Sequence, residues 1–307
     1  MKKKKEKPKN HGGHVRNGSL AFDIFNYVFL GLIAAVCLLP ILNVLAISFS
    51  SSAKASAGLV GLVPLDFNLQ SYKYALTKPQ FLTSFLTSIK RVVLGLLINM
   101  TCTILTAYPL SKSPKELKGR NIYAWFMFIT MVFSGGLIPQ FMVVKQTNIM
   151  NTIWALILPG AVPVFNVIIL MNFFKQIPKE IQESAMMDGA GHLRILAQLY
   201  LPLSLPSLAT ITLFTVVGHW NEWFAGIIYM TDPANYPLQT YLQSIIVVRD
   251  TALLATASKE TLEMMSTVSD RTLKSAQIFI AAAPILAVYP FVQKYFMKGL
   301  TVGSVKG

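Results

Sequence analysis

The sequence predicts an all-α membrane protein with six transmembrane helices, on three observations. Of its 307 residues, 53% are apolar and only 13% are charged, whereas a soluble domain carries about 25% charged residues. The mean hydropathy is positive, at +0.53. Apolar runs recur along the chain, and a run of roughly 20 residues crosses a bilayer as a helix. The six predicted spans cover residues 24–49, 81–111, 122–144, 152–174, 203–230 and 276–295.

The N-terminal residues, 1–20, are predicted to form a basic cytoplasmic tail. They begin MKKKKEKPKN and are followed by no cleavage site of small residues, so they do not read as a signal peptide. The first span then runs without a charged residue. The second is longer than a bilayer requires because Lys90 and Arg91 interrupt its start. Residues 81–89 are therefore expected to form a separate interfacial helix.

Pro and Gly residues are scattered through the predicted spans. Each removes a helix hydrogen bond or adds flexibility, which is tolerated only where neighbouring helices or a water-filled path cover the freed backbone. The pattern therefore favours a bundle around a pathway over a simple anchor. The residues are Pro40, Pro109, Gly135, Gly136, Pro139, Pro159, Pro163, Pro284 and Pro290.

Basic residues predict which side of the membrane each segment faces. Most of the 27 Lys and Arg residues lie near the two termini, in 112–120 and in 175–194. Because Lys and Arg are enriched in cytoplasmic loops, both termini and this last segment are expected in the cytoplasm. The predicted order is a tail at 1–20, a membrane domain at 21–296 and a cytoplasmic tail at 297–307. Within the membrane domain, 178–202 is expected to be cytoplasmic and 231–275 extracytoplasmic, with 251–270 partly helical.

One polar segment, EIQESAMMDGAGHLRILAQLYLP at 180–202, separates two apolar spans. Glu183 lies near the start of a predicted helix, where the helix dipole favours negative charge. Gly189 and Gly191 are expected to end that helix, because glycine adopts the left-handed conformation at little cost. A second short helix is expected at 192–200. Such a two-faced pair suits docking into a groove of another protein; the alternative is a pair lying on the membrane surface.

The spacing in this segment resembles the cytoplasmic signature, or EAA motif, of the permease subunits of ATP-binding-cassette (ABC) importers. That signature reads Glu-Ala-Ala, three residues, Gly, nine residues, Ile-x-Leu-Pro. This chain has Glu183-Ser184-Ala185, then Gly189, then Leu199-x-Leu201-Pro202. Ser184 and Leu199 are mild departures from the pattern.

Other stretches extend the resemblance over nearly the whole chain. AYPLSKS at 107–113, FSGGLIPQ at 133–140 and HWNEW at 219–223 are similar to the carbohydrate-uptake branch. FSGGLIP and the terminal YFMKGLTVGSVKG resemble the sub-family that imports complex oligosaccharides or polysaccharide fragments in Gram-positive bacteria.

The resemblance implies a multi-pass subunit of a type I importer in the cytoplasmic membrane. Its implied partners are an ABC ATPase homodimer, a second and unlike permease subunit, and an extracytoplasmic solute-binding protein. The chain has no G-x-x-x-x-G-K-[ST] loop, so it is not expected to be an enzyme. It is expected to hold no cofactor, with ATP and Mg bound by the ATPase. The resemblance implies a coupling role for seven residues: Glu183, Ser184, Ala185, Asp188, Gly189, Leu201 and Pro202. Among these, Glu183 would meet a basic residue of the ATPase, and Gly189 would allow a sharp turn.

The motif HWNEW, His219–Trp223, is expected within the fifth span. An ionisable side chain is costly in lipid and by default marks a functional site. On a continuous helix, His219, Glu222 and Trp223 would share one face. Sugars present apolar CH faces and a rim of hydroxyls, which suit the rings of Trp220 and Trp223 and the polar groups of Asn221 and Glu222. All five residues are therefore expected to line a substrate path; alternatively, the tryptophans anchor the chain at the membrane interface.

Other functions fit the sequence less well. The net charge is +14, but the basic residues gather at the ends of apolar runs, so no nucleic acid is expected as a partner. No second His-containing motif accompanies His219 and Glu222 in the spans, so no metal site is expected. A secondary transporter with Glu222 as proton carrier is the alternative function. The sequence does not specify whether the sugar is neutral or acidic.

Overall fold

The structure, a computed structural model, describes residues 18–247 and 269–303. Its described residues form helices and no strand, in agreement with the predicted all-α class. Most of the predicted tail at 1–20, the helical tendency expected at 251–270, and the last residues of the 297–307 tail lie outside the described residues.

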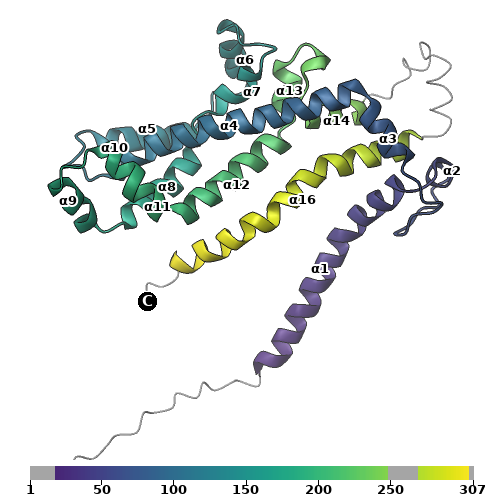
Figure 1. Ribbon diagram of the computed structural model, residues 1–307, viewed down its shortest axis with the longest axis horizontal. Helices are drawn as coiled ribbons and strands as arrows, with labels where there is room; N and C mark the ends of the chain where they lie inside the picture. Colours follow the sequence, from purple (N-terminus) through teal and green to yellow (C-terminus); the bar gives the residue numbers. More distant parts are fainter. Residues whose placement is uncertain (1–17, 248–268, 304–307) are drawn as a thin grey trace, which may run out of the picture.

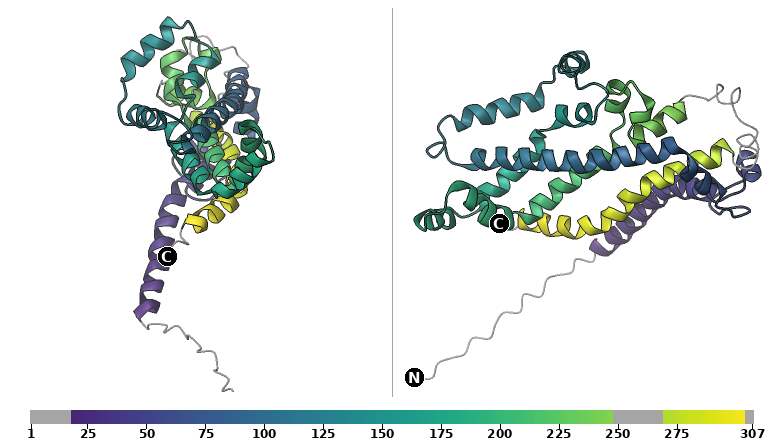
Figure 2. Two further views of the ribbon diagram at one scale, coloured as in Figure 1. Left: turned by 90° about the vertical axis from the view of Figure 1, so that its left-hand side faces the viewer. Right: turned by 45° about the horizontal axis from the view of Figure 1, so that its top comes forward.

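The central helix of the bundle is α4 (Pro79–Ser111). It is a single helix of 33 residues that continues through the two basic residues near its start, so the separate interfacial helix expected at 81–89 is wrong. Helices α8 (Val164–Gln176) and α12 (Leu205–Asn221) pack along it. On the far side of α12 lie α16 (Asp270–Gly303) and then α1 (Gly18–Ser48) (Figures 1 and 2).

Small and polar side chains, rather than the largest apolar ones, form the buried stripe along the middle of α4. In a bilayer there is no hydrophobic gain from burying leucine, because lipid tails are equally apolar, so small and polar residues form the helix contacts. Leu86, Val93 and Leu97 are accordingly exposed on α4. The buried stripe consists of Ser84, Ser88, Arg91, Gly95, Asn99, Thr103 and Ala107, spaced three or four residues apart.

Three predicted spans are broken rather than continuous. The run at 122–144 forms α5 (Arg120–Val132) and α6 (Leu137–Gln146), which meet at 111°. The run at 152–174 forms α7 (Ile153–Ile157), η1 (Leu158–Gly160) and α8, with a 48° bend. The run at 203–230 contains α12, which ends at Asn221, and the short α13 (Phe224–Tyr229). None of these three runs is therefore one straight helix, and their crossing of the membrane as six spans stays a prediction.

The residue types at two of these breaks explain why the helix is interrupted there. The first falls at a Ser-Gly-Gly sequence, where Gly136 adopts a φ of +86° that glycine tolerates. The second falls between two prolines, Pro159 and Pro163, which lack the helix N–H. By length and composition, two described helices could cross a membrane unbroken, at 22–48 and 79–111, and up to five could if each bent pair counts as one span.

Several short helices lie near the two ends of α4. Helices α2 (Ser52–Ser56) and α3 (Gln70–Thr77) lie near its N-terminal end (Figure 1). At its C-terminal end lie α9 (Lys179–Met187), α10 (His192–Ile195), the π-helical η2 (Leu196–Tyr200) and α11 (Leu201–Leu203). Helix α13 is followed by η3 (Pro233–Asn235) and α14 (Leu238–Val247).

Candidate functional site

The polar segment forms a helix, a tight turn and a second helix, as its pattern predicts. Helix α9 ends in a Schellman turn, in which the Gly189 N–H donates to the Met186 carbonyl and the Ala190 N–H to the Ala185 carbonyl, each at 3.0 Å. Gly189 has the left-handed φ of +80° that this turn requires. The second helix begins at His192 and continues through η2.

Four of the predicted coupling residues share the exposed surface of this elbow, which we define as residues 179–200. Glu183, Ser184, Asp188 and Gly189 are exposed, whereas Ala185 is half-buried against the neighbouring core. Two large apolar side chains, Met187 at 88% and Leu193 at 76% exposure, lie on the same elbow. Leu201 and Pro202 come after it, in α11. The elbow therefore presents carboxylates beside apolar side chains, a mixture typical of a protein interface.

A buried lysine ties the elbow to α4. Lys112 caps the C-terminal end of α4, and its Nζ donates to Gln182 Oε1 at 2.6 Å and to the Tyr200 hydroxyl at 3.0 Å. The same Nζ lies 4.0 Å from the ring centroid of Tyr108 and 4.1 Å from that of Tyr200. Gln182, the buried residue of α9, also accepts from the Tyr200 hydroxyl and donates to Glu116. The charge of Lys112 is thus compensated by aligned oxygens and by two aromatic faces.

Replacing Lys112 by methionine is expected to change how stability depends on pH. Burial lowers the pKa of Lys112 to about 8, despite the opposing attraction of Glu116, whereas an unfolded lysine titrates near pH 10.4. Between these values the unfolded chain binds more protons, so Lys112 makes the folded state relatively more stable as pH rises. Raising the pH from about 7 to about 9.5 should therefore increase the unfolding temperature of the wild type relative to Lys112→Met.

Lys115→Met is the matched control, because Lys115 is exposed in the same loop. The unfolding temperature of Lys115→Met should change with pH in the same way as that of the wild type. An identical pH response of the wild type and Lys112→Met would contradict the role of the buried charge.

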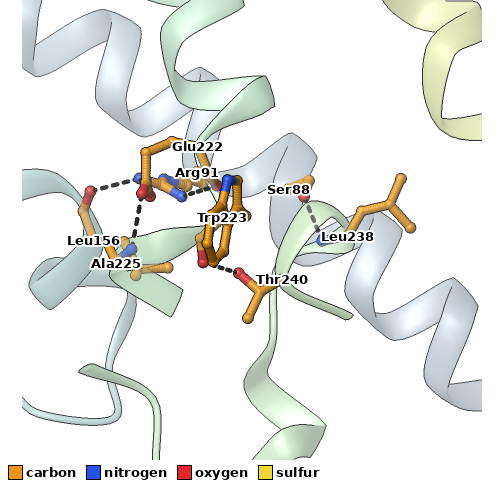
Figure 3. A network of polar contacts seen from close by, with 8 residues as sticks. All are labelled: Ser88, Arg91, Leu156, Glu222, Trp223, Ala225, Leu238 and Thr240. Atoms are coloured by element: carbon orange, nitrogen blue, oxygen red, sulfur yellow. Dashed lines mark hydrogen bonds and ion pairs between the residues drawn. The ribbon is translucent and has the colours of Figure 1, made fainter. Parts of the chain in front are cut away.

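A second buried cation, Arg91, holds the break between α12 and α13 (Figure 3). Its Nη1 donates to the backbone carbonyl of Glu222 at 2.9 Å, and its Nη2 pairs with the Glu222 carboxylate at 2.7 Å. Nη2 also donates to the carbonyl of Leu156 at 3.3 Å, near the end of α7. The Glu222 carboxylate in turn accepts from the Ala225 N–H at 2.8 Å and so caps the first turn of α13. Arg91 and Glu222 therefore hold the α12–α13 break, and Arg91 also ties it to α7.

Because α12 ends at Asn221, the HWNEW motif does not present one helix face. Glu222 is extended, with φ −74° and ψ 119°, so the shared face expected for His219, Glu222 and Trp223 is wrong. Trp220 is buried, and its indole N–H donates to the Ala281 carbonyl at 3.0 Å. It packs inside the protein rather than at a membrane interface.

The other four residues of the motif divide between two cavities. His219 and Glu222 line one of about 500 Å³, bounded by α4, α7, α8, α12 and α13. Asn221 and Trp223 line another, of about 440 Å³, against α14 and α16. A role in transport stays a prediction for all five residues.

The first cavity contains polar atoms without a protein partner. Within the described residues, Arg91 Nε, Asn99 Oδ1 and His219 Nε2 are buried and unpaired. The His219 ring fits only because residue 95 is glycine, since a Cβ there would overlap the ring. The one ion pair among its described lining residues leaves this cavity without net charge.

Arg91, Lys112 and Gln182 are the residues that the sequence-based prediction missed. Arg91 was treated as an interruption of a span and Lys112 as an orientation signal. A usable signal was present, because an intramembrane cation and an intramembrane carboxylate are expected to pair. Glu222 therefore required a partner, and the choice lay between Lys90 and Arg91.

Comparison with known proteins gives consistent matches. The family described as "Binding-protein-dependent transport system inner membrane component" matches residues 117–302. Protein LplC of Bacillus subtilis is 40% identical over 297 residues, covering 97% of this chain and 99% of the relative. The polygalacturonan/rhamnogalacturonan transport system permease protein YtcP of the same organism is 40% identical over 93% of this chain and 98% of its own length.

One solved structure is similar over most of the chain. It is that of a bacterial ABC transporter involved in the import of the acidic polysaccharide alginate. A chain of that structure superposes with a TM-score of 0.83 at 32% identity, covering 91% of this chain and 98% of the solved one.

Proposed function

The chain belongs to the family of binding-protein-dependent transport system inner membrane components, and on that premise we propose that it is a permease subunit of an ABC importer of oligosaccharides or polysaccharide fragments. Permease subunits of this family are not themselves enzymes, so the energy for transport comes from another chain. YtcP is named for polygalacturonan and rhamnogalacturonan transport, and the similar solved structure is of an alginate importer. These substrates support a carbohydrate as the transported class.

The elbow at 179–200 is the proposed docking site for an ATPase subunit. The observation that carries this proposal is its rigidity combined with exposure: the Schellman turn and the Lys112 contacts fix its shape, while Glu183, Ser184 and Asp188 remain free of the rest of the fold. A rigid element of this kind transmits a partner's movement, whereas a mobile loop absorbs it. We propose that Glu183 meets a basic residue of the ATPase there.

The orientation proposed for the chain places this elbow in the cytoplasm. Helix α16 ends toward the side of the molecule that holds α9 (Figure 1), which supports cytoplasmic placement of both. The opposite end, near α2 and α3, would then meet the solute-binding protein. A second, unlike permease and lipid would cover the exposed apolar helices, of which α1 and α5 are the most extensive. Six spans remain the proposed number.

The geometry of Glu222 favours a permease over a proton-coupled secondary transporter. A proton carrier needs a carboxylate that can gain and release its proton. Glu222 instead pairs with Arg91 at 2.7 Å and caps α13 through Ala225. These contacts favour a fixed group that holds the helix break.

Cross-linking at Ser184 tests the proposed docking. Ser184→Cys, in a chain whose native Cys37 and Cys102 are replaced by alanine, should form a disulfide or bismaleimide product with the ATPase subunit of the purified complex. Leu62→Cys, exposed at the far end of α4, is the control and should capture none. Capture at residue 62 but not at residue 184 would reverse the proposed orientation, and capture at neither would remove the docking site.

A further inference from the structure

The cavity that contains Asn221 and Trp223 has a lining suited to a sugar. It measures about 440 Å³ and lies between the α12–α13 break, α14 and α16. Its polar lining comes from Asn221, Gln239 and Gln243, and its exposed aromatic surface from Trp223. Apolar side chains complete it: Leu242, Ile278, Ala281, Ala282, Ile285 and Leu286.

The three amides are available to a ligand. Gln239 and Gln243 lie one turn apart on α14, so they share a face of that helix. In the described part of the chain, no hydrogen bond joins the side-chain amide of Asn221, Gln239 or Gln243 to another residue. Each amide can both donate and accept, which matches a hydroxyl group's own capacity. The Trp223 side chain is 40% exposed beside them.

The backbone around Trp223 is held in place against α14. Thr240, which is fully buried, donates from Oγ1 to the Trp223 carbonyl at 2.9 Å (Figure 3). This close approach depends on Gly226, because a Cβ there would overlap the Thr240 side chain. The start of α14 is fixed in turn by the Leu238 N–H, which donates to Ser88 Oγ of α4 at 2.8 Å. The indole and the amides therefore belong to one preorganised unit.

None of the described residues that line this cavity carries a charge. The nearest charged side chain in sequence, Glu222, lines the other cavity and is paired with Arg91. Within the described part of the chain, the cavity therefore has no cation with which to pair a uronate carboxylate. This matters because two of the similar proteins transport acidic polysaccharides.

We propose that this cavity is a glycosyl-binding subsite that recognises the uncharged parts of a sugar ring and ignores its carboxylate. The CH face of the ring would stack on the Trp223 indole, and its hydroxyls would bond to Asn221, Gln239 and Gln243. The proposal rests on the function proposed above and adds to it the chemistry of one contact point along the path. Charge selection then falls to other components of the importer.

Two probes of equal length isolate the effect of charge. Tetragalacturonate and its fully methyl-esterified form have the same ring stereochemistry, but only the first is charged. The full chain, assembled in lipid nanodiscs with the ATPase and the second permease but without the solute-binding protein, is titrated with each probe while tryptophan fluorescence is followed. The wild type should bind both probes, with affinities that agree within about threefold.

Trp223→Ala should lower the affinity for both probes at least about tenfold and abolish the fluorescence change. Gln243→Leu should lower the affinity for both probes but leave a fluorescence change. Trp223→Phe, which keeps a flat ring, should retain part of the affinity. Trp125→Ala is the matched control, because Trp125 is an exposed tryptophan on α5, outside this cavity. The unfolding temperature of each variant shows that the fold is retained.

Three results would overturn the subsite: tight binding of the acid but not the ester, unchanged binding by Trp223→Ala, or no binding of either probe by the wild type. None of them affects the cross-link at residue 184, which depends on the elbow alone. Loss of that cross-link with normal probe binding would instead remove the docking proposal and leave the subsite standing.

Discussion

Replacing Gly189 by aspartate is expected to abolish uptake while the chain still inserts in the membrane. The left-handed φ of +80° at this position costs an L-residue about 1–2 kcal/mol. Apart from its two chain neighbours, no described residue lies within 4 Å of where a Cβ would be, so the new side chain would meet the proposed ATPase cleft. There it adds a carboxylate beside Asp188 and blocks close approach of the backbone. The measurement is co-purification of the ATPase together with uptake by the assembled importer.

Two neighbouring substitutions separate these causes. Gly191→Asp adds the same side chain two residues later, where φ is −72° and space is also open, so it should retain most of the uptake. Gly189→Asn introduces a residue that tolerates the left-handed region and adds no charge. Its uptake should lie between that of Gly189→Asp and that of Gly191→Asp. Equal co-purification of the ATPase by all three variants would place the docking surface elsewhere.

Replacing Arg91 by methionine is expected to destabilise the protein by about 3 kcal/mol, the lower end of the range for breaking a buried pair. The lower end applies because Glu222 is 34% exposed and water screens part of its charge. The variant leaves the Glu222 carboxylate without its cation and the Leu156 carbonyl without its donor. Its abundance in the membrane and its unfolding temperature should both fall.

The adjacent lysine provides the control. Lys90 is exposed on α4, so Lys90→Met removes the same charge one residue away and should have little effect. The double variant Arg91→Met/Glu222→Gln should recover part of the loss, because no uncompensated charge remains. If the Lys90 and Arg91 variants were equally stable, the ion pair would not hold the α12–α13 break.

The fold class and the elbow were predictable because both depend on local patterns. Apolar run length reports membrane insertion directly, and Gly189 marks a left-handed turn that few other residues form. The elbow's boundaries differ from the prediction only in the π-helical turn at its end. Family membership followed from the same short segment.

The helix breaks and the buried polar contacts were less predictable because they depend on tertiary partners. The sequence around Glu222 contains neither proline nor glycine at the break itself, and the extended backbone there is stabilised by Arg91, 131 residues earlier in the chain. Lys112 similarly gives no local sign of burial, since its partner Gln182 is supplied by another helix. Residue types predicted which positions were polar, but not which cavity each would face.

The uninterrupted length of α4 has a mechanical consequence. Its 33 residues extend about 50 Å, well beyond the roughly 30 Å hydrocarbon core. Lys112 follows Arg91 by about 30 Å along this one continuous helix, in which Pro109 is the only interior proline. Under the docking proposed above, an ATPase subunit bound at the elbow would therefore act on the same helix that holds the α12–α13 break through Arg91.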